Sequence, residues 1–155
     1  PAGRLTVVSA SLRATMTPTA DDNIDIIQLG GMVRHSSISV VGQYSMEILR
    51  GCSFSKLFLG VDGIDLDFGI STTDMREAEL NRVMMQAAQK TVVLADSSKF
   101  GRRGFARISR LEDVDIIITD SKVPQTVVKK IEEMGIDLII AGAAGMQQEH
   151  KTETY

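Results

Sequence analysis

Four polar side chains with useful chemistry stand next to each other at Asp96, Ser97, Ser98 and Lys99. They directly follow the apolar run Val92–Ala95, which we expect to be a buried strand. Ligands of parallel α/β sheets bind outside the carboxyl ends of the strands. An ammonium beside two hydroxyls and exposed backbone N–H groups suits a phosphate or a sugar hydroxyl. The plainer alternative is that the aspartate caps a turn and that the serines are ordinary loop residues.

A second apolar run leads into the pair Asp62-Gly63. A glycine lets backbone N–H groups approach a ligand closely, and an aspartate can accept hydrogen bonds or act as a base. Asp-Gly is also a common turn pair, and from the residues alone the turn is the stronger interpretation. Glu77 lies in the first turn of a predicted helix. A role at the helix dipole is likewise its stronger interpretation on these grounds.

The residues after Lys99 are typical of a mobile loop. Gly101 and Gly104 flank Arg102 and Arg103. We expect both arginines to be solvated charges rather than ligand contacts.

Apolar runs alternate with helical patterns along the chain. The predicted strands are Leu5–Val8, Ile24–Leu29, Ile38–Val41, Phe54–Val61, Thr91–Ala95, Asp115–Thr119 and Asp137–Ala141. The predicted helices are Leu12–Met16, Tyr44–Arg50, Asp74–Gln89 and a segment that begins near Pro124 and ends at Gly135. This alternation predicts an α/β fold with three layers, a mainly parallel sheet and helices on both faces.

Composition narrows the classes of function. The chain has 155 residues, 43% of them hydrophobic, which favours one packed domain. A net charge of −3 argues against a nucleic-acid-binding surface on this chain. The single cysteine, Cys52, excludes an internal disulfide and favours a reducing, cytoplasmic location. No apolar run approaches the ~18 residues that span a bilayer, so we expect no membrane association.

Motifs for common cofactors do not occur. The sequence has no G-x-G-x-x-G and no G-x-x-x-x-G-K-[ST], so it does not support a dinucleotide site or a P-loop. His35, Cys52 and His150 lack the spacing of metal ligands. We therefore expect neither a cofactor nor a metal.

A set of segments in one order resembles a known family. They read V-V-S-A-S-L-R-A, I-I-Q-L-G-G-M-V-R, F-L-G-V-D-G-I, F-G-I-S-T, E-A-E-L, V-V-L-A-D-S-S-K-F-G and D-V-D-I-I-I-T-D. The order resembles the C-terminal sensor domain of bacterial DeoR-type transcriptional repressors, over roughly residues 5 to 141. The resemblance implies a fold like ribose-5-phosphate isomerase and an effector that is a phosphorylated sugar. It also implies that operator DNA is bound by an N-terminal helix-turn-helix absent from this chain, and that the protein is a homo-oligomer.

The resemblance also implies which residues bind the effector. Family positions that line the ligand pocket correspond to Asp62, Gly63, Glu77, Asp96, Ser98 and Lys99. Ser9 and Ser11 stand where the family often has Thr-Asn-Ser, and we treat them as replacements. The family's Asp-Ser-Gly-Thr-Thr phosphate loop is absent here. We therefore expect residues 1–141 to form a sensor domain that lacks its first strand and phosphate loop, followed by a polar tail at 142–155.

Isomerases with the same fold are the alternative from another class. They use an Asp-Gly-Ala-Asp type of loop, a lysine in a glycine-rich turn and a glutamate on the next helix. This chain keeps carboxylates at Asp62, Asp65 and Glu77, but no lysine lies between Lys56 and Lys90. Stabilising an enediolate needs such a charge, so we expect a sensor rather than an enzyme. A domain that serves oligomerisation alone is a third possibility.

Overall fold

The computed structural model describes residues 3–17 and 22–142, which form two compact units. The first unit is Pro1–Cys52 and the second is Ser53–Tyr155, and each is described here by itself. The polar tail predicted at 142–155 lies outside the described residues, apart from Gly142.

The first unit pairs its strands in two small sheets. Its elements are β1 (Leu5–Ser9), α1 (Leu12–Met16), β2 (Ile24–Gln28), β3 (Met32–Arg34), β4 (Ser39–Val41) and α2 (Gln43–Arg50). Strands β1 and β2 are parallel, and β3 and β4 are antiparallel. The predicted helix Leu12–Met16 is confirmed as α1.

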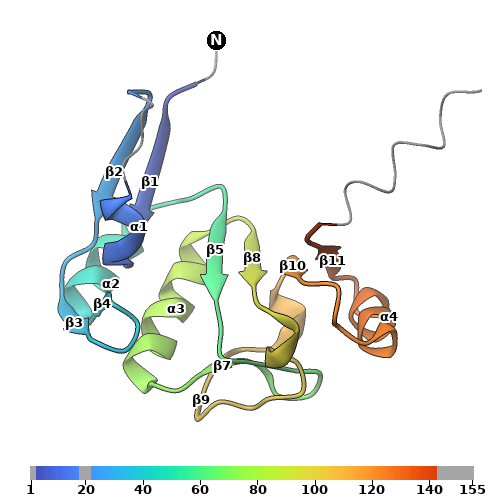
Figure 1. Ribbon diagram of the computed structural model, residues 1–155. Coiled ribbons are helices and arrows are strands. Elements are labelled where there is room, and N and C mark those ends of the chain that lie inside the picture. The colour runs from blue at the N-terminus through green and yellow to red at the C-terminus, as the bar shows by residue number, and fades with distance from the viewer. Residues whose placement is uncertain (1–2, 18–21, 143–155) are drawn as a thin grey trace, which may run out of the picture. The chain divides into compact units, whose positions relative to one another are not determined.

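The second unit contains the larger sheet. Its strands are β5 (Leu57–Gly60), β6 (Gly63–Asp65), β7 (Gly69–Thr72), β8 (Thr91–Leu94), β9 (Ala106–Ser109), β10 (Ile116–Thr119) and β11 (Asp137–Ile140). Its helices are α3 (Met75–Ala87) and α4 (Gln125–Glu133), with 3-10 turns η1 (Ser97–Lys99) and η2 (Leu111–Asp113). Four parallel strands lie side by side in the order β11-β10-β8-β5 (Figure 1). A separate antiparallel sheet has the order β6-β7-β9.

Along each parallel strand, successive side chains point to opposite faces of the sheet. Leu59, Val93 and Ile117 are neighbours across the register and are buried in the main core cluster. Ala78 of α3 and Ile131 of α4 belong to the same cluster. The strands join the sheet in chain order and in one direction, so right-handed connections bring both helices to this face.

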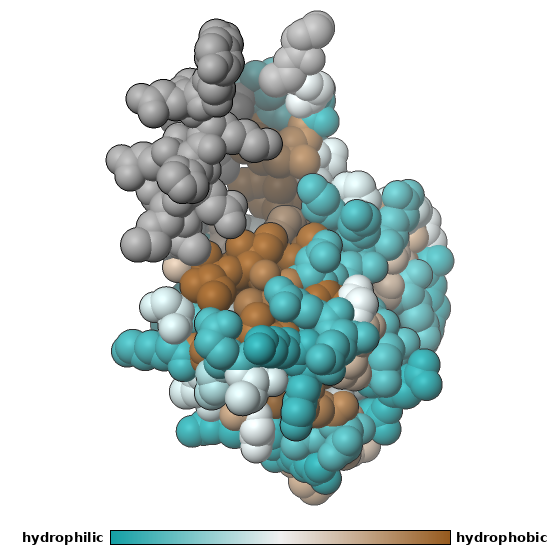
Figure 2. Space-filling view, turned by 90° about the vertical axis from the view of Figure 1, so that its right-hand side faces the viewer, coloured by the Kyte–Doolittle hydropathy of each residue, from teal (hydrophilic) through white to brown (hydrophobic). Residues whose placement is uncertain are grey.

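The other face of the same sheet presents large apolar side chains to solvent. Phe58, Leu94 and Ile139 alternate with the core residues and are 61%, 43% and 48% exposed. Figure 2 shows apolar surface gathered on one side of the molecule.

Local signals explain the helix ends. The Asp74 side chain accepts hydrogen bonds from the backbone N–H groups of Arg76 and Glu77 and so begins α3. Gly135, with φ of 82°, follows the end of α4. The predicted α/β class with a mainly parallel sheet is confirmed, whereas the antiparallel sheet was not expected. Within the described residues, no helix is both long enough and apolar enough to cross a membrane.

Candidate functional site

Aspartates follow three neighbouring strands of the parallel sheet. Asp62 comes two residues after β5, Asp96 two residues after β8, and Asp120 directly after β10. Because these strands are parallel and adjacent, their carboxyl ends meet at one edge of the sheet. The sequence predicts the candidate site at this edge, and the structure adds Asp120 to it.

Asp96 and Asp120 shape the turn that carries Lys99. Asp96 accepts a hydrogen bond from the Ser98 backbone N–H at 2.9 Å, and Asp120 accepts one from the Ser97 N–H at 2.8 Å. Hydrogen bonding from the Ser98 side chain, and then from its N–H, lowers the pKa of Asp96. The Ser97 and Lys122 N–H groups lower the pKa of Asp120. These contacts confirm the alternative that Asp96 caps a turn. The cap fixes the backbone around Lys99.

Lys99 is half-buried at the end of η1. Its backbone N–H donates to the Asp96 carbonyl at 3.0 Å. None of the ion pairs within residues 3–17 and 22–142 includes its ammonium. This hydrogen bond fixes the backbone at Lys99, and the ammonium keeps its three donors for another partner.

Asp62 and Glu77 meet on one hydroxyl. The Thr72 Oγ1 atom lies 2.9 Å from a carboxylate oxygen of Asp62 and 2.9 Å from one of Glu77. Thr72 is only 2% exposed, so its position is fixed by burial. A hydroxyl has one proton and donates to one acceptor at a time. The Thr72 hydroxyl therefore donates to only one of these two carboxylates at a time, and a polyol can supply a hydroxyl proton to Asp62.

The loop that carries Lys99 is fastened to the antiparallel sheet. The Gly101 N–H donates to the Ile64 carbonyl at 2.8 Å, and the Gly104 N–H donates to Ser71 Oγ at 2.8 Å. The Arg103 guanidinium pairs with Asp65 at 3.0 Å. This corrects the expectation of a loop with two solvated arginines, because Arg103 has a specific carboxylate partner. That ion pair also lowers the pKa of Asp65.

Two glycines allow this close approach. A Cβ atom at Gly63 would lie 2.5 Å from the Arg102 carbonyl oxygen, and one at Gly104 would lie 2.6 Å from that of Thr72. The sequence suggested that Gly63 lets a ligand approach the backbone. In the structure, the group that approaches Gly63 belongs to the chain's own loop.

Ser9 and Ser11 lie in the first unit, whereas the other predicted site residues lie in the second. Ser9 Oγ accepts a hydrogen bond from the Ser11 N–H at 3.0 Å. The Ser11 side chain accepts one from the Ala14 N–H and begins α1. Their role toward a ligand stays a prediction.

Sequence reasoning overlooked Asp120 and Thr72. Asp120 carries the same signal as Asp62 and Asp96, a carboxylate just after an apolar strand, and the segment D-V-D-I-I-I-T-D contains it. Thr72 has no such signal, because its contacts depend on how β7 leads into α3. No group of three or more potential metal ligands occurs among the residues that the structure describes.

The fastened loop gives a stability prediction. We expect Gly104→Ala to lower the free energy of unfolding by about 1–3 kcal/mol, because the new methyl group overlaps the Thr72 carbonyl. Gly60→Ala is the matched control, since a Cβ there meets nothing within 4 Å. Urea denaturation of both variants measures the difference, and equal midpoints would show that the loop does not pack as described.

The lowered pKa values of Asp96 and Asp120 give a pH prediction. A carboxyl whose pKa is lower in the folded state stabilises the fold above its unfolded pKa, and this contribution disappears as the pH falls through the folded pKa. Stability should therefore decrease as the pH falls below the ordinary aspartate value of 3.8. Urea midpoints at about pH 6 and about pH 3 test this. Asp120→Asn should show a smaller decrease than the unchanged chain, and an equal decrease would contradict the assignment.

A family model and several curated proteins match this chain. Residues 1–121 match the family model described as the DeoR C-terminal sensor domain. The chain is 34% identical to the uncharacterized HTH-type transcriptional regulator YulB of Bacillus subtilis, over 83% of this chain and 50% of that protein. It is 31% identical to the HTH-type transcriptional regulator GlpR of Haloferax volcanii, over 88% of this chain and 53% of that protein.

A third relative has a name that mentions a metabolite. It is the glycerol-3-phosphate regulon repressor of Haemophilus influenzae, 26% identical over 88% of this chain and 53% of that protein. The chain spans about half the length of these curated relatives. With a family model matched over most of its residues, the chain belongs to the DeoR C-terminal sensor domain family.

Proposed function

We propose that the chain is the effector-sensing part of a sugar-metabolism repressor and that it binds a phosphorylated sugar or polyol. The observation that carries this proposal is the arrangement at the carboxyl edge of the parallel sheet. A half-buried ammonium without an ion pair among the described residues lies on a loop that is fastened to the sheet beside two carboxylates. A phosphorylated polyol has both an anionic group and hydroxyl donors, so it matches this combination.

The roles divide by charge. Lys99 and the backbone N–H groups near it would contact the phosphate, because they are cationic or partly positive. Asp62 and Glu77 would accept hydrogen bonds from sugar hydroxyls, because a carboxylate repels phosphate but strongly accepts from O–H. Thr72 holds those two carboxylates in place. The name of the Haemophilus influenzae relative, which refers to glycerol 3-phosphate, supports a small phosphorylated polyol as the class of effector.

An effector bound at this edge would regulate transcription only if it changed the affinity of another part of the protein for DNA. We propose that operator binding belongs to a helix-turn-helix outside residues 1–155 and that the repressor works as a cytoplasmic homo-oligomer. The net charge of −3 supports the first point, because a DNA-binding surface is normally basic.

The ligand role of Lys99 can be tested by substitution. We expect Lys99→Ala in a repressor that contains this chain to weaken effector binding about 10–150-fold, as for the loss of one charged hydrogen bond worth about 1.5–3 kcal/mol. Operator affinity without effector should stay unchanged. Lys129→Ala, at an exposed lysine on α4, is the control. The measurement is operator affinity during titration with glycerol 3-phosphate and hexose 6-phosphates. If wild type and Lys99→Ala release DNA at the same effector concentration, Lys99 is not a contact.

The alternative function, sugar-phosphate isomerisation, has one supporting feature and one opposing feature. The Asp62 and Glu77 carboxylates resemble a general acid–base pair. No lysine occurs from Leu57 to Gln89, however, so the chain lacks the ammonium that the isomerases place between those carboxylates.

An activity assay distinguishes the two functions. We expect no ketose formation from ribose 5-phosphate above the uncatalysed rate, because the chain has no lysine between Asp62 and Glu77, where the isomerases place the ammonium that stabilises an enediolate. The assay follows ketose absorbance with the unchanged protein and with Asp62→Asn. Turnover that disappears in the Asp62→Asn variant would establish an enzyme and overturn the sensor assignment.

A further inference from the structure

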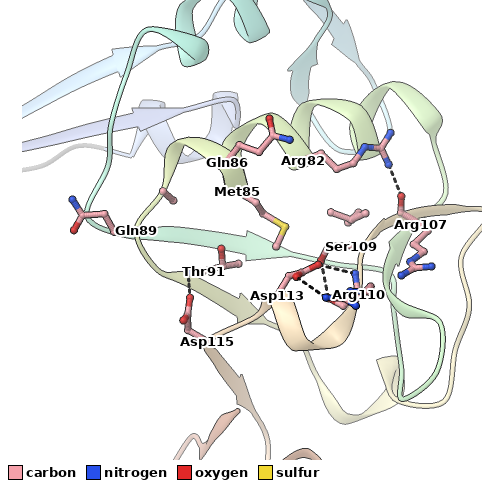
Figure 3. Close-up of a pocket in the computed structure, with 12 residues that line it drawn as sticks. Arg82, Met85, Gln86, Gln89, Thr91, Arg107, Ser109, Arg110, Asp113 and Asp115 are labelled. Carbon is pink, nitrogen blue, oxygen red and sulfur yellow. Dashed lines mark hydrogen bonds and ion pairs between the residues drawn. The ribbon is translucent and has the colours of Figure 1, made fainter. Parts of the chain in front are cut away.

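A depression of about 720 Å³ lies in the second unit, away from the site proposed above. Helix α3 forms one wall, β9 and the segment leading into η2 form another, and the starts of β8 and β10 close a third side (Figure 3). Thr91 and Asp115 mark the amino ends of those two strands. The depression therefore lies at the amino ends of β8 and β10, whereas Asp96 and Asp120 lie at their carboxyl ends.

Three arginines from three elements line the depression. Arg82 belongs to α3, Arg107 to β9, and Arg110 to the start of η2. In Figure 3, the Arg82 side chain extends from the helix toward Arg107. Three arginines from separate elements give this lining positive charge, although the chain as a whole carries a charge of −3.

Two of these guanidinium groups are held by neutral partners. Arg82 is half-buried, and its Nη1 donates to the Arg107 carbonyl oxygen at 2.6 Å. The Arg107 guanidinium carbon lies 5.9 Å from the centre of the Phe68 ring. Neither arginine takes part in any of the ion pairs found among the described residues. Their positions are thus fixed while their charges are not neutralised.

The acidic residues of the depression are already occupied. Asp115 accepts a hydrogen bond from the Thr91 N–H at 2.7 Å. Asp113 accepts one from the Arg110 N–H at 3.2 Å and pairs with the Arg110 guanidinium at 3.8 Å. Asp113 thus offsets the charge of Arg110, whereas Asp115 keeps its own negative charge, and the three arginines still outnumber the two aspartates of the lining.

We propose that this depression is a second anion site, which takes a compact multivalent anion through Arg82 and Arg107. Guanidinium groups present paired N–H donors that match two oxygens of a phosphate or a carboxylate. Both are pre-positioned, by a carbonyl and by an aromatic ring, so less side-chain entropy is lost on binding. Gln86, on the same wall as Arg82, adds a neutral donor that can reach a further oxygen.

The chemistry leaves two sources for such an anion, a phosphate compound and a polycarboxylate. Pyrophosphate and citrate represent them, and calorimetric titration of the 155-residue chain at low ionic strength compares their affinities. We expect saturable binding of at least one of the two. The stronger of the two identifies the class of the natural ligand.

Matched variants test the assignment. Arg82→Gln and Arg107→Gln should each weaken binding of the stronger anion by at least about tenfold, as for the loss of a charged hydrogen bond. Arg76→Gln is the control, because Arg76 lies on the same helix but pairs with Asp74. Lys99→Ala removes the ammonium of the carboxyl-edge site, so the anion binding that remains in Lys99→Ala and is weakened by Arg82→Gln and Arg107→Gln belongs to the depression.

Several outcomes would overturn the proposal. They are absence of saturable binding of both anions, equal affinities in Arg82→Gln, Arg107→Gln and the unchanged chain, or an equal loss in Arg76→Gln. Should Arg82→Gln fail to fold, Arg107→Gln decides alone, because Arg107 is an exposed residue outside the core.

Discussion

The parallel alignment of β5, β8 and β10 determines where the polar residues of the proposed effector site lie. Because the three strands run in the same direction, the residues that leave them reach one edge of the sheet. The buried line Leu59, Val93 and Ile117 fixes the register, since a slip by one residue would turn these side chains out of the core. Packing of apolar residues thus positions the carboxylates, although none of the carboxylates contributes to the core.

The antiparallel sheet brings together chain segments that are distant in sequence. Ser71 of β7 receives the Gly104 N–H, and Ile64 of β6 receives the Gly101 N–H. The next residue of β7, Thr72, holds the Asp62 and Glu77 carboxylates. One short sheet therefore connects the loop that supplies positive charge with the residues that supply negative charge. The phosphate of a phosphorylated polyol would then meet the positive groups, and its hydroxyls would meet the carboxylates.

Local sequence patterns were sufficient for the parallel strands, for α1 and α3, and for the polar residues at the carboxyl edge. The apolar runs before Asp62 and Asp96 are continuous and end abruptly, which is a strong local signal. The strands β6, β7 and β9 read G-I-D, G-I-S-T and A-R-I-S, so they contain no continuous apolar run and lack such a signal. The contacts of Arg103 and Thr72 depend on the pairing of those strands, which joins residues far apart in the sequence. Glycines 101 and 104 therefore suggested mobility, whereas in the structure their N–H groups fasten the loop.

The way in which this loop is attached has a consequence for the diversity of sensors. Its attachment uses the N–H groups of two glycines, one carbonyl and a serine hydroxyl of the sheet, with Arg103 as the one side chain of the loop that adds an ion pair. The side chains of Lys99 and Arg102 take no part in it. In the proposed effector site, a substitution at Lys99 would therefore change which effector is bound while the backbone path stays the same. In that site, effector binding and the stability of the loop would depend on different groups. Single substitutions would then change effector specificity in variants that still fold.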